Sequence, residues 1–287
     1  QIFCYVKGIL YLIILGEKMI ELSSEQLRQL QVIELEMLVE VDRICKENNI
    51  KYTIIGGTLL GAVRHGGFIP WDDDADVAML RPEYEKFCRE CEKSLNTKKF
   101  YLQNMDNTQG YRWGYAKLRR KGTVFLRQHQ EHMNYEQGIF LDIFPIDATP
   151  DNELLRVIHD FRCFCVRKVL WSAVGKNVAE NPLERLIYKL LYQIPEKTIK
   201  KWYKGLILKK KADTTEIVRT LTFPAPKKMR GYYRRWFAQT APIQFEGHEF
   251  QGVEDYQGWL RYEFGDYMKL PPKEKRKAHP ISDIKFV

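Results

Sequence analysis

Aspartates at alternate positions are the part of this 287-residue sequence with the clearest chemical potential. Asp72, Asp74 and Asp76 run into an apolar stretch at 77–80 that predicts a strand, and alternate strand residues share one face. Like charges on one face repel each other, and a cation compensates them. Because Mg²⁺ prefers oxygen ligands, the spacing predicts a Mg²⁺ or Mn²⁺ site. The alternative is an acidic solvated loop, which the apolar flanks disfavour.

A further aspartate, Asp142, lies inside the strongly apolar run 138–145. A lone buried carboxylate is costly, so Asp142 needs a partner. We interpret that partner as the cation held by Asp74 and Asp76. The alternative is a residue that caps a turn at a strand end, a role that fits Asp147 better.

A glycine-rich turn, Gly56-Gly57-Thr58, falls between a predicted strand and a predicted helix. Glycines let backbone N–H groups approach an anion, and a helix N-terminus favours negative charge. Alone this turn is weak evidence of function, but together with the aspartates it indicates phosphoryl or nucleotidyl transfer. The candidate phosphate ligands, each of which could instead be a solvated cation, are Arg64, Lys117 and Arg119.

The elements that must position these residues follow from hydrophobic periodicity. Ser23 to Gln26 predicts a capping box that begins an amphipathic helix ending near residue 49. The elements predicted after it are a strand at 52–55, a helix from 58, a strand at 72–80, a helix at 82–95 and strands near 99–104, 114–119 and 138–144. The pattern is then mostly helical to about 211, and 223–287 predicts loops with short helices.

This order indicates an α/β (α+β) protein with one catalytic core and a helical C-terminal extension. The predicted division is a leader of uncertain status at 1–20, a core at 21–150 and a helical, loop-rich extension at 151–287 packed on that core. Three interpretations of the apolar residues 1–19 are open: a membrane-surface anchor, a core strand, or a translated leader before a true start at Met19. We favour the translated leader.

The amino-acid composition and net charge exclude some classes of protein and favour others. A hydrophobic content of 45% can build a core, and no stretch approaches the roughly 20 apolar residues of a membrane span. An integral multi-span protein is therefore excluded. The net charge of +9 suits an anionic partner. The six scattered cysteines indicate free thiols in a reducing compartment, with a zinc site at Cys88 and Cys91 as the less favoured reading.

Residues 55–77, together with 264–276 and His279, resemble the LicD family of phosphotransferases. The resemblance implies the polymerase-beta-like nucleotidyltransferase fold, a mixed sheet with flanking helices. It also implies that the Gly-Gly-Thr turn holds nucleotide phosphates and that Asp74, Asp76 and Asp142 hold metal. Asp72 would be an extra acid near the metal. Ala75 departs from the bulkier aliphatic residue usual in the family.

The resemblance implies transfer of phosphocholine from CDP-choline, or of a similar group from another CDP-linked donor. The acceptor would be a sugar hydroxyl on a lipid-linked or polymeric surface glycan, such as teichoic acid or lipopolysaccharide. Fukutin-type relatives use CDP-ribitol. Asp142 is the candidate general base. Aromatic residues suit a quaternary ammonium, although they can equally be core residues: Tyr111, Trp113, Tyr115, Tyr135 and Trp171.

Two other functions remain open. A nucleotidyltransferase that uses CTP would share the metal site and release pyrophosphate. A non-catalytic basic scaffold would use the mixed cations and aromatics of 230–236, which more often pack as a loop. The acidic face would repel nucleic acid, so no nucleic-acid partner is expected. Basic residues in 200–235 and 273–277 predict a cytoplasmic protein at the inner face of the membrane, in peripheral contact with anionic lipid.

Overall fold

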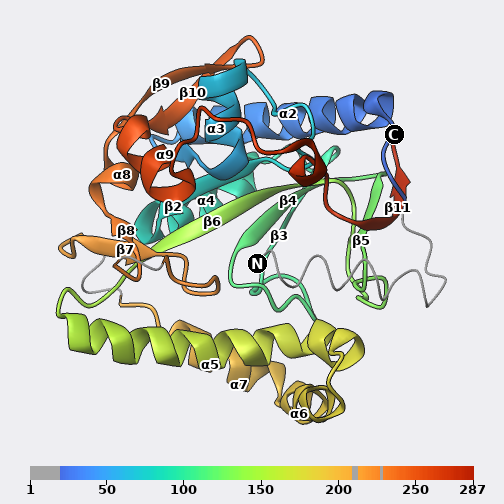
Figure 1. Cartoon of the computed structure of the whole chain (residues 1–287), viewed down its shortest axis with the longest axis vertical. Helices are drawn as coiled ribbons and strands as arrows, with labels where there is room; N and C mark the ends of the chain where they lie inside the picture. The colour runs from blue at the N-terminus through green and yellow to red at the C-terminus, as the bar shows by residue number, and fades with distance from the viewer. Residues whose placement is uncertain (1–19, 209–212, 227–228) are drawn as a thin grey trace.

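The structure is a computed structural model that describes residues 20–208, 213–226 and 229–287 (Figure 1). Its first long helix, α2 (Ser24–Glu47), begins at the predicted capping box. The Ser23 hydroxyl accepts a hydrogen bond from the Gln26 amide at 3.1 Å, and the Gln26 side chain accepts one from the Ser23 amide at 3.0 Å. The capping box is therefore confirmed. The expected leader at 1–19 lies outside the described residues.

A mixed sheet forms the centre of the molecule, with strand order β1-β2-β6-β4-β3. The pair β2–β6 is parallel, and the other neighbours are antiparallel. Two short strands, β7 and β8, continue from the far end of β6. These strands are β1 (Thr53–Ile54), β2 (Asp76–Leu80), β3 (Phe100–Gln103), β4 (Ala116–Arg120), β6 (Phe140–Ala148), β7 (Ile217–Arg219) and β8 (Tyr232–Tyr233). The mixed α/β class is confirmed.

Two helices connect the first strands. The helix α3 (Gly56–His65) joins β1 to β2, and α4 (Arg81–Ser94) joins β2 to β3. The prediction of a strand over 72–80 was partly wrong, because β2 begins only at Asp76. The backbone at 72–75 is irregular, and the Asp72 amide donates to the Ile69 carbonyl at 2.9 Å, which turns the chain before the strand.

A helical layer follows the sheet and confirms the helical prediction for this region. It consists of α5 (Glu153–Val178), α6 (Pro182–Tyr192) and α7 (Glu196–Lys204), which lie along the lower edge of Figure 1. Asn152 and Asn181 cap α5 and α6. The layer has a small core of its own, which includes Cys163, Leu170 and Tyr203. Within the described ranges, no helix combines the length and apolar character that crossing a membrane requires.

The C-terminal region contains strands that were not predicted. A hairpin of β9 (Thr240–Phe245) and β10 (His248–Val253) turns at Glu246 and Gly247, whose φ angles are 51° and 76°. The last strand, β11, pairs with β5. The remaining elements are β5 (Val124–Arg127), α8 (Arg235–Ala238), α9 (Tyr256–Phe264), the 3₁₀ turn η2 (Lys273–Lys275) and β11 (Ile281–Lys285). The expectation of loops and short helices alone was wrong.

The hairpin and α9 contribute to the same core as the sheet and α2, through side chains such as Phe245, Phe250 and Trp259. Residues beyond 215 therefore pack with residues 21–150, whereas 153–206 build most of the second core. The division at residue 150 stays a prediction. The described cysteines, Cys45, Cys88, Cys91, Cys163 and Cys165, are free thiols.

Candidate active site

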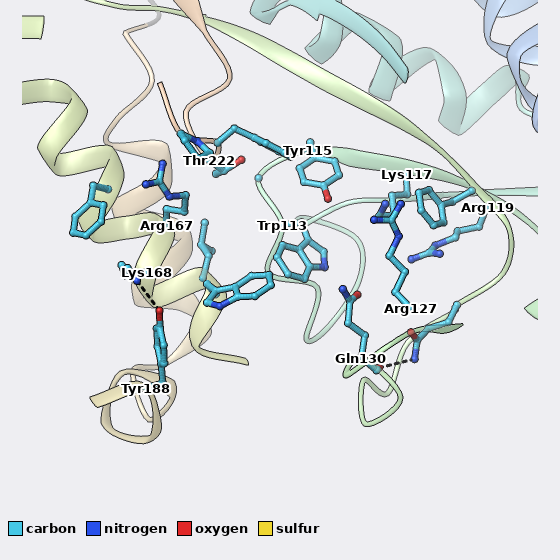
Figure 2. A pocket seen from close by; sticks show the side chains of 18 of the residues that line it. Trp113, Tyr115, Lys117, Arg119, Arg127, Gln130, Arg167, Lys168, Tyr188 and Thr222 are labelled. Atoms are coloured by element: carbon cyan, nitrogen blue, oxygen red, sulfur yellow. Dashed lines mark hydrogen bonds between the residues drawn. The ribbon is translucent and has the colours of Figure 1, made fainter. Parts of the chain in front are cut away.

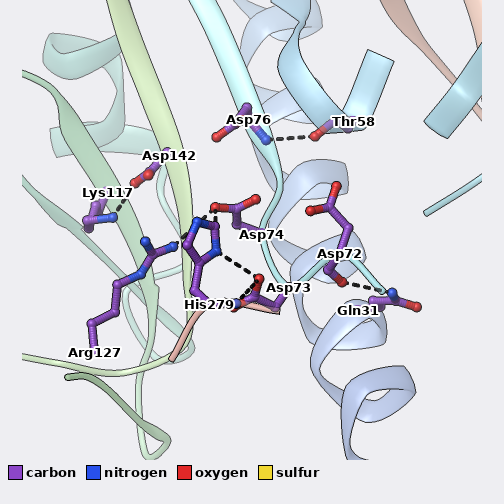
Figure 3. Close-up of polar contacts among 10 residues, drawn as sticks. All are labelled: Gln31, Thr58, Asp72, Asp73, Asp74, Asp76, Lys117, Arg127, Asp142 and His279. Carbon is purple, nitrogen blue, oxygen red and sulfur yellow. Dashed lines mark hydrogen bonds and ion pairs between the residues drawn. The ribbon is translucent and has the colours of Figure 1, made fainter. Parts of the chain in front are cut away.

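Two of the predicted aspartates lie side by side on the central strands. Asp76 is the first residue of β2, and it is the register partner of Asp142 on β6 in the parallel pairing. The irregular residues before β2 carry Asp72, Asp73 and Asp74 next to this pair (Figure 3). The acids therefore gather around the start of β2, in the middle of the sheet, and they come from a loop and two strands instead of alternating along one strand.

The Gly-Gly-Thr turn lies against the same acids. Gly56 has φ of 61°, and a Cβ there would come within 2.7 Å of Asp76 Oδ2. A Cβ on Gly57 would overlap the Asp72 carboxylate. Glycine is thus required because the carboxylates approach the backbone closely. The Thr58 hydroxyl accepts a hydrogen bond from the Asp76 amide at 2.8 Å, so this side chain fixes the start of β2.

The residues at 66–75, which we name the aspartate loop, are held by three distant parts of the chain. The Gln31 side chain of α2 donates to the Asp72 carbonyl at 3.0 Å. Glu246, at the tip of the hairpin, accepts from the Phe68 amide at 3.0 Å. His279, just before β11, donates its amide to Asp73 Oδ1 at 3.0 Å, and its Nδ1 lies 2.8 Å from the same oxygen.

Negative charge in this region is incompletely compensated. Burial, followed by the charges of Asp74 and Asp73, raises the pKa of Glu34 well above its usual range. Burial and the charge of Asp74 likewise raise the pKa values of Asp72 and Asp76. Such shifts mark carboxylates that are costly to keep ionised without a further positive charge.

Two cationic side chains and a histidine contact these acids. Lys117 Nζ lies 2.5 Å from an oxygen of Asp142, and Arg127 Nη2 lies 3.1 Å from Asp74 Oδ2 (Figure 3). Burial, only partly offset by Asp142, lowers the pKa of Lys117 to about 7. Burial would also lower the pKa of Arg127, but the nearby aspartates raise it.

The third side chain that contacts the acids is His279, which lies against Asp73. Burial alone would raise the pKa of Asp73, whereas the hydrogen bond and charge of His279 lower it. The Asp73–His279 contact therefore stabilises the ionised form of Asp73.

The donor types in this cluster fit a hard divalent cation, because every candidate ligand is a carboxylate oxygen. Within the described part of the chain, one buried oxygen of Glu34 and one of Asp73 have no hydrogen-bond partner. However, among the described residues no three acidic, histidine or cysteine side chains already form a ligand set. Asp74 and Asp142 instead accept from Arg127 and Lys117. A Mg²⁺ or Mn²⁺ site therefore stays a prediction.

Of the three predicted phosphate ligands, Lys117 and Arg119 line the same cavity, whereas Arg64 lies apart from them. Lys117 binds Asp142 and also lines a cavity. Arg119 is buried and donates to Gln103 at 3.1 Å and to the Gly138 carbonyl at 2.8 Å. Arg64 lies near the other end of α3 from Gly56, roughly 12 Å along the helix axis, and donates to the Tyr267 carbonyl at 2.8 Å.

A cavity of about 540 Å³ opens beside the acids, between the sheet and α5 (Figure 2). Lys117, Arg119 and Arg127 line the sheet side, and Arg167 and Lys168 line the helix side. Aromatic side chains lie between these two groups of cations (Figure 2). A cavity of this composition suits a ligand that carries phosphate and an apolar or cationic group.

The predicted choline-binding aromatics divide into two groups. Trp113 and Tyr115 line the cavity, as does Trp171, whose ring centroid lies 5.9 Å from that of Trp113. Tyr135 accepts a hydrogen bond from Trp113 at 3.1 Å. Tyr111 is fully buried and packs against Tyr135, with ring centroids 5.5 Å apart. Tyr111 and Tyr135 thus support Trp113 from outside the cavity lining.

Three residues of the site were not predicted from the sequence: Glu34, Arg127 and the partner role of His279. Glu34 could have been found, since it occupies the apolar stripe of α2 between Leu30 and Leu38. Arg127 gave no local signal, because it reaches Asp74 only through the fold.

Residues 49–162 match the family described as LicD/FKTN/FKRP, nucleotidyltransferase domain, and this range includes the glycine turn and all the candidate aspartates. A protein of Haemophilus influenzae named lipopolysaccharide cholinephosphotransferase LicD is 28% identical over 264 residues. The alignment covers 90% of this chain and 97% of that protein. This chain therefore contains a LicD-family domain.

The chain is also similar to two uncharacterized Rickettsia proteins over a shorter stretch. The protein from Rickettsia typhi is 37% identical over 70 residues, which are 22% of this chain and 23% of that protein. The protein from Rickettsia prowazekii is 39% identical over 70 residues, covering 22% of this chain and 26% of that protein.

Proposed function

We propose that this LicD-like phosphotransferase moves phosphocholine from a CDP-linked donor, CDP-choline first among them, to a hydroxyl of a cell-surface glycan. Teichoic acid and lipopolysaccharide are the acceptor classes. The name of the Haemophilus relative, which aligns along nearly its whole length, supports this choice of transferred group. The mixed sheet, with acids on the parallel pair β2–β6, supports a polymerase-beta-like core.

One observation carries the proposal: Lys117 and Arg127 contact the acids and line the cavity at the same time. A diphosphate bound in the cavity competes with Asp142 and Asp74 for these two cations. Donor binding is thereby coupled to the release of the carboxylates that must act. A structural ion pair buried in a core would have no open side from which a ligand could approach.

In this proposal Asp74, Asp76 and Asp142, with Asp72 beside them, hold Mg²⁺ or Mn²⁺. The cation supplies charge compensation for the phosphates and lowers the pKa of the acceptor hydroxyl. The hydroxyl attacks the phosphorus atom of the phosphate that carries choline, and Asp142 accepts the proton of that hydroxyl. The bond from this phosphorus to CMP breaks, and CMP leaves. Lys117, released from Asp142, and Arg127 bind phosphate oxygens, and the backbone at Gly56 and Gly57 admits the phosphates.

The aromatic side chains of the cavity account for the choline group. Trp113, Tyr115 and Trp171 present ring faces to a space already bordered by cations, so a quaternary ammonium gains cation–π attraction there while its phosphate meets the cations. A CDP-linked polyol would gain nothing from these rings, and this difference favours choline over ribitol or glycerol.

The experiment is a thermal-shift series with CDP-choline, CDP-ribitol, CDP-glycerol and CTP, each with and without Mg²⁺. It needs no acceptor. A donor at 100 times its Kd adds about 2.7 kcal/mol of stability. We expect a Mg²⁺-dependent shift with CDP-choline that Asp74→Asn abolishes and that Asp213→Asn, at an exposed acid, retains.

Other outcomes would replace parts of the proposal. A shift with CTP alone, accompanied by pyrophosphate release in place of CMP, would indicate a nucleotidyltransferase. A shift with a CDP-polyol alone would retain the site and change the transferred group. No shift with any of the four compounds would contradict the enzyme proposal and favour a non-catalytic scaffold.

A further inference from the structure

The helical layer exposes apolar side chains in two regular stripes. Both stripes repeat at intervals of three and four residues, so each occupies one helix face. The stripe on α5 consists of Leu154, Val157, Ile158, Phe161 and Phe164, and the stripe on α6 of Leu183, Leu186, Ile187 and Leu190. All nine side chains are exposed to solvent.

These stripes lie opposite the faces that the two helices bury. The buried face of α5 carries His159, Cys163 and Val166, and that of α6 carries Tyr188. Leu154 is 69% exposed and Leu190 is 64% exposed, values typical of a fully solvated side chain. Single exposed leucines are ordinary, but contiguous apolar faces on two consecutive helices mark an interaction surface.

Charge identifies the kind of partner. Residues 153–204 contain eleven Lys and Arg against five Asp and Glu, a net charge of +6 out of +9 for the whole chain. Exposed cations lie on the same helices, among them Arg162 on α5 and Lys189 on α6. An apolar stripe bordered by cations suits an anionic leaflet, whereas a second copy of this basic layer would be repelled.

We propose that the apolar stripes of α5 and α6 dock on the surface of an anionic membrane, with their side chains in the headgroup region and the flanking cations on the lipid phosphates. This surface differs from the one expected from the basic runs at 200–235 and 273–277. The proposal rests on the helical layer alone. If the proposed function also holds, docking brings the cavity, whose wall includes Arg167 and Trp171 of α5, close to a lipid-linked acceptor.

The test is co-sedimentation of the full chain with vesicles of phosphatidylcholine alone or mixed equally with phosphatidylglycerol. We expect binding to the anionic vesicles that weakens as salt is raised to about 0.5 M. Leu154→Ser with Ile158→Ser, and Leu186→Ser with Leu190→Ser, should each weaken binding about tenfold or more. Val32→Ser is the matched control, since this α2 residue is 49% exposed outside the stripes.

Binding that survives both pairs of stripe substitutions would overturn the proposal, because another segment would then hold the protein on lipid. Absence of binding to anionic vesicles by the unmodified chain would overturn it as well. Sedimentation velocity tests the other partner that could cover the stripes, a second copy of this chain. A dimer that the stripe substitutions convert to a monomer would assign the surface to a second copy and contradict membrane docking.

A spectroscopic readout uses Cys165, an exposed thiol one helical turn after Phe161 on the same face of α5, while Cys45, Cys91 and Cys163 are buried. A polarity-sensitive dye on Cys165, in a chain carrying Cys4→Ser and Cys88→Ser, should shift its emission to the blue with anionic vesicles. An unchanged spectrum under conditions of full sedimentation would exclude α5 from the contact and overturn the two-helix proposal.

The two proposals fail separately. Asp74→Asn should abolish the donor-induced thermal shift and leave vesicle binding unchanged. The stripe substitutions should leave that thermal shift unchanged, because none of the four substituted side chains lines the cavity. If instead the stripe variants bound vesicles normally, the docking proposal would be contradicted. Loss of the donor-induced shift in these variants would not count against the enzyme proposal, which the unmodified chain tests.

Discussion

The acid cluster around the start of β2 and the helical layer depart from the usual distribution of residues in opposite directions. In the acid cluster and beside it, Glu34, Asp76 and Lys117 are charged or titratable groups held out of water. In the helical layer, side chains such as Leu154 and Leu190 are apolar groups held in water. Each arrangement is unfavourable for the isolated fold. The two proposals each supply a partner of the opposite character, a cation or phosphate for the first region and lipid for the second.

The comparison also separates activity from stability. Buried acids that repel each other lower the stability of the fold, so removing one should stabilise the protein while it abolishes the reaction. Apolar stripes on the surface contribute little to the fold, so changing them should leave both stability and chemistry intact. Four predictions test this contrast.

The largest effect is expected from Asp76→Asn. We expect the rate of CMP release from CDP-choline in the presence of acceptor to fall roughly 10³-fold, because a proposed ligand of the cation that would stabilise the reacting phosphate is lost. The free energy of unfolding should rise by about 1 kcal/mol, since burial and the charges of Asp74 and Asp142 disfavour ionised Asp76. Thermal unfolding measures the second quantity. Loss of activity together with a lower unfolding temperature would contradict this account.

Two glycines give a matched pair. Gly56 and Gly66 both have positive φ, at 61° and 72°, but only Gly56 lies against a carboxylate. Gly56→Ala and Gly66→Ala should each cost about 1 kcal/mol of unfolding free energy. Only Gly56→Ala should also reduce turnover, by roughly 10²-fold, because Asp76 is displaced. Equal turnover in the two variants, measured as CMP release, would contradict the inference that Gly56 is needed because Asp76 lies so close to its backbone.

Asp142→Asn should behave unlike Asp76→Asn in stability. The substitution leaves buried Lys117 without its partner, so we expect a loss of about 2 kcal/mol in unfolding free energy. Adding Lys117→Met should recover most of that loss, since no uncompensated charge remains. Chemical denaturation measures both variants. An additive loss in the double variant would show that the pair does not interact, and near-normal turnover of Asp142→Asn would exclude it as general base.

The smallest effect is expected in the helical layer. Leu186→Ser with Leu190→Ser should change the unfolding free energy by less than about 0.5 kcal/mol, because these side chains are solvated in the fold. Leu170→Ser, at a buried position of α5, is the contrasting variant and should be strongly destabilising. A large loss in the α6 variant, measured by thermal unfolding, would mean that its stripe is covered in solution.

The sequence predicted those parts of the site that are local. The glycine turn and the aspartates fall within residues 56–76, where consecutive elements bring them together, and Asp142 stood out as an acid in an apolar run. The partners of these acids could not be predicted in the same way. Arg127 meets Asp74 through a loop and a strand of another sheet, and neither is visible in local periodicity.

The fold was predictable to a similar degree. The capping box, α4 and the helical layer followed from periodicity and caps. The β9–β10 hairpin was missed because Pro242 and several polar residues interrupt its apolar pattern, although Glu246-Gly247 is a recognisable turn. The start of β2 was placed too early, because acids that alternate with other residues imitate a strand where the chain in fact turns.

The contacts of the aspartate loop have a consequence for protein synthesis. Glu246 and His279, which hold the loop at Phe68 and Asp73, are encoded about 180 and 206 residues later. A nascent chain that has already folded α2, α3 and β2 on the ribosome still lacks both contacts. The carboxylates can take their final positions only after nearly the whole polypeptide has emerged, so a chain whose translation stops early is left with an unassembled candidate site.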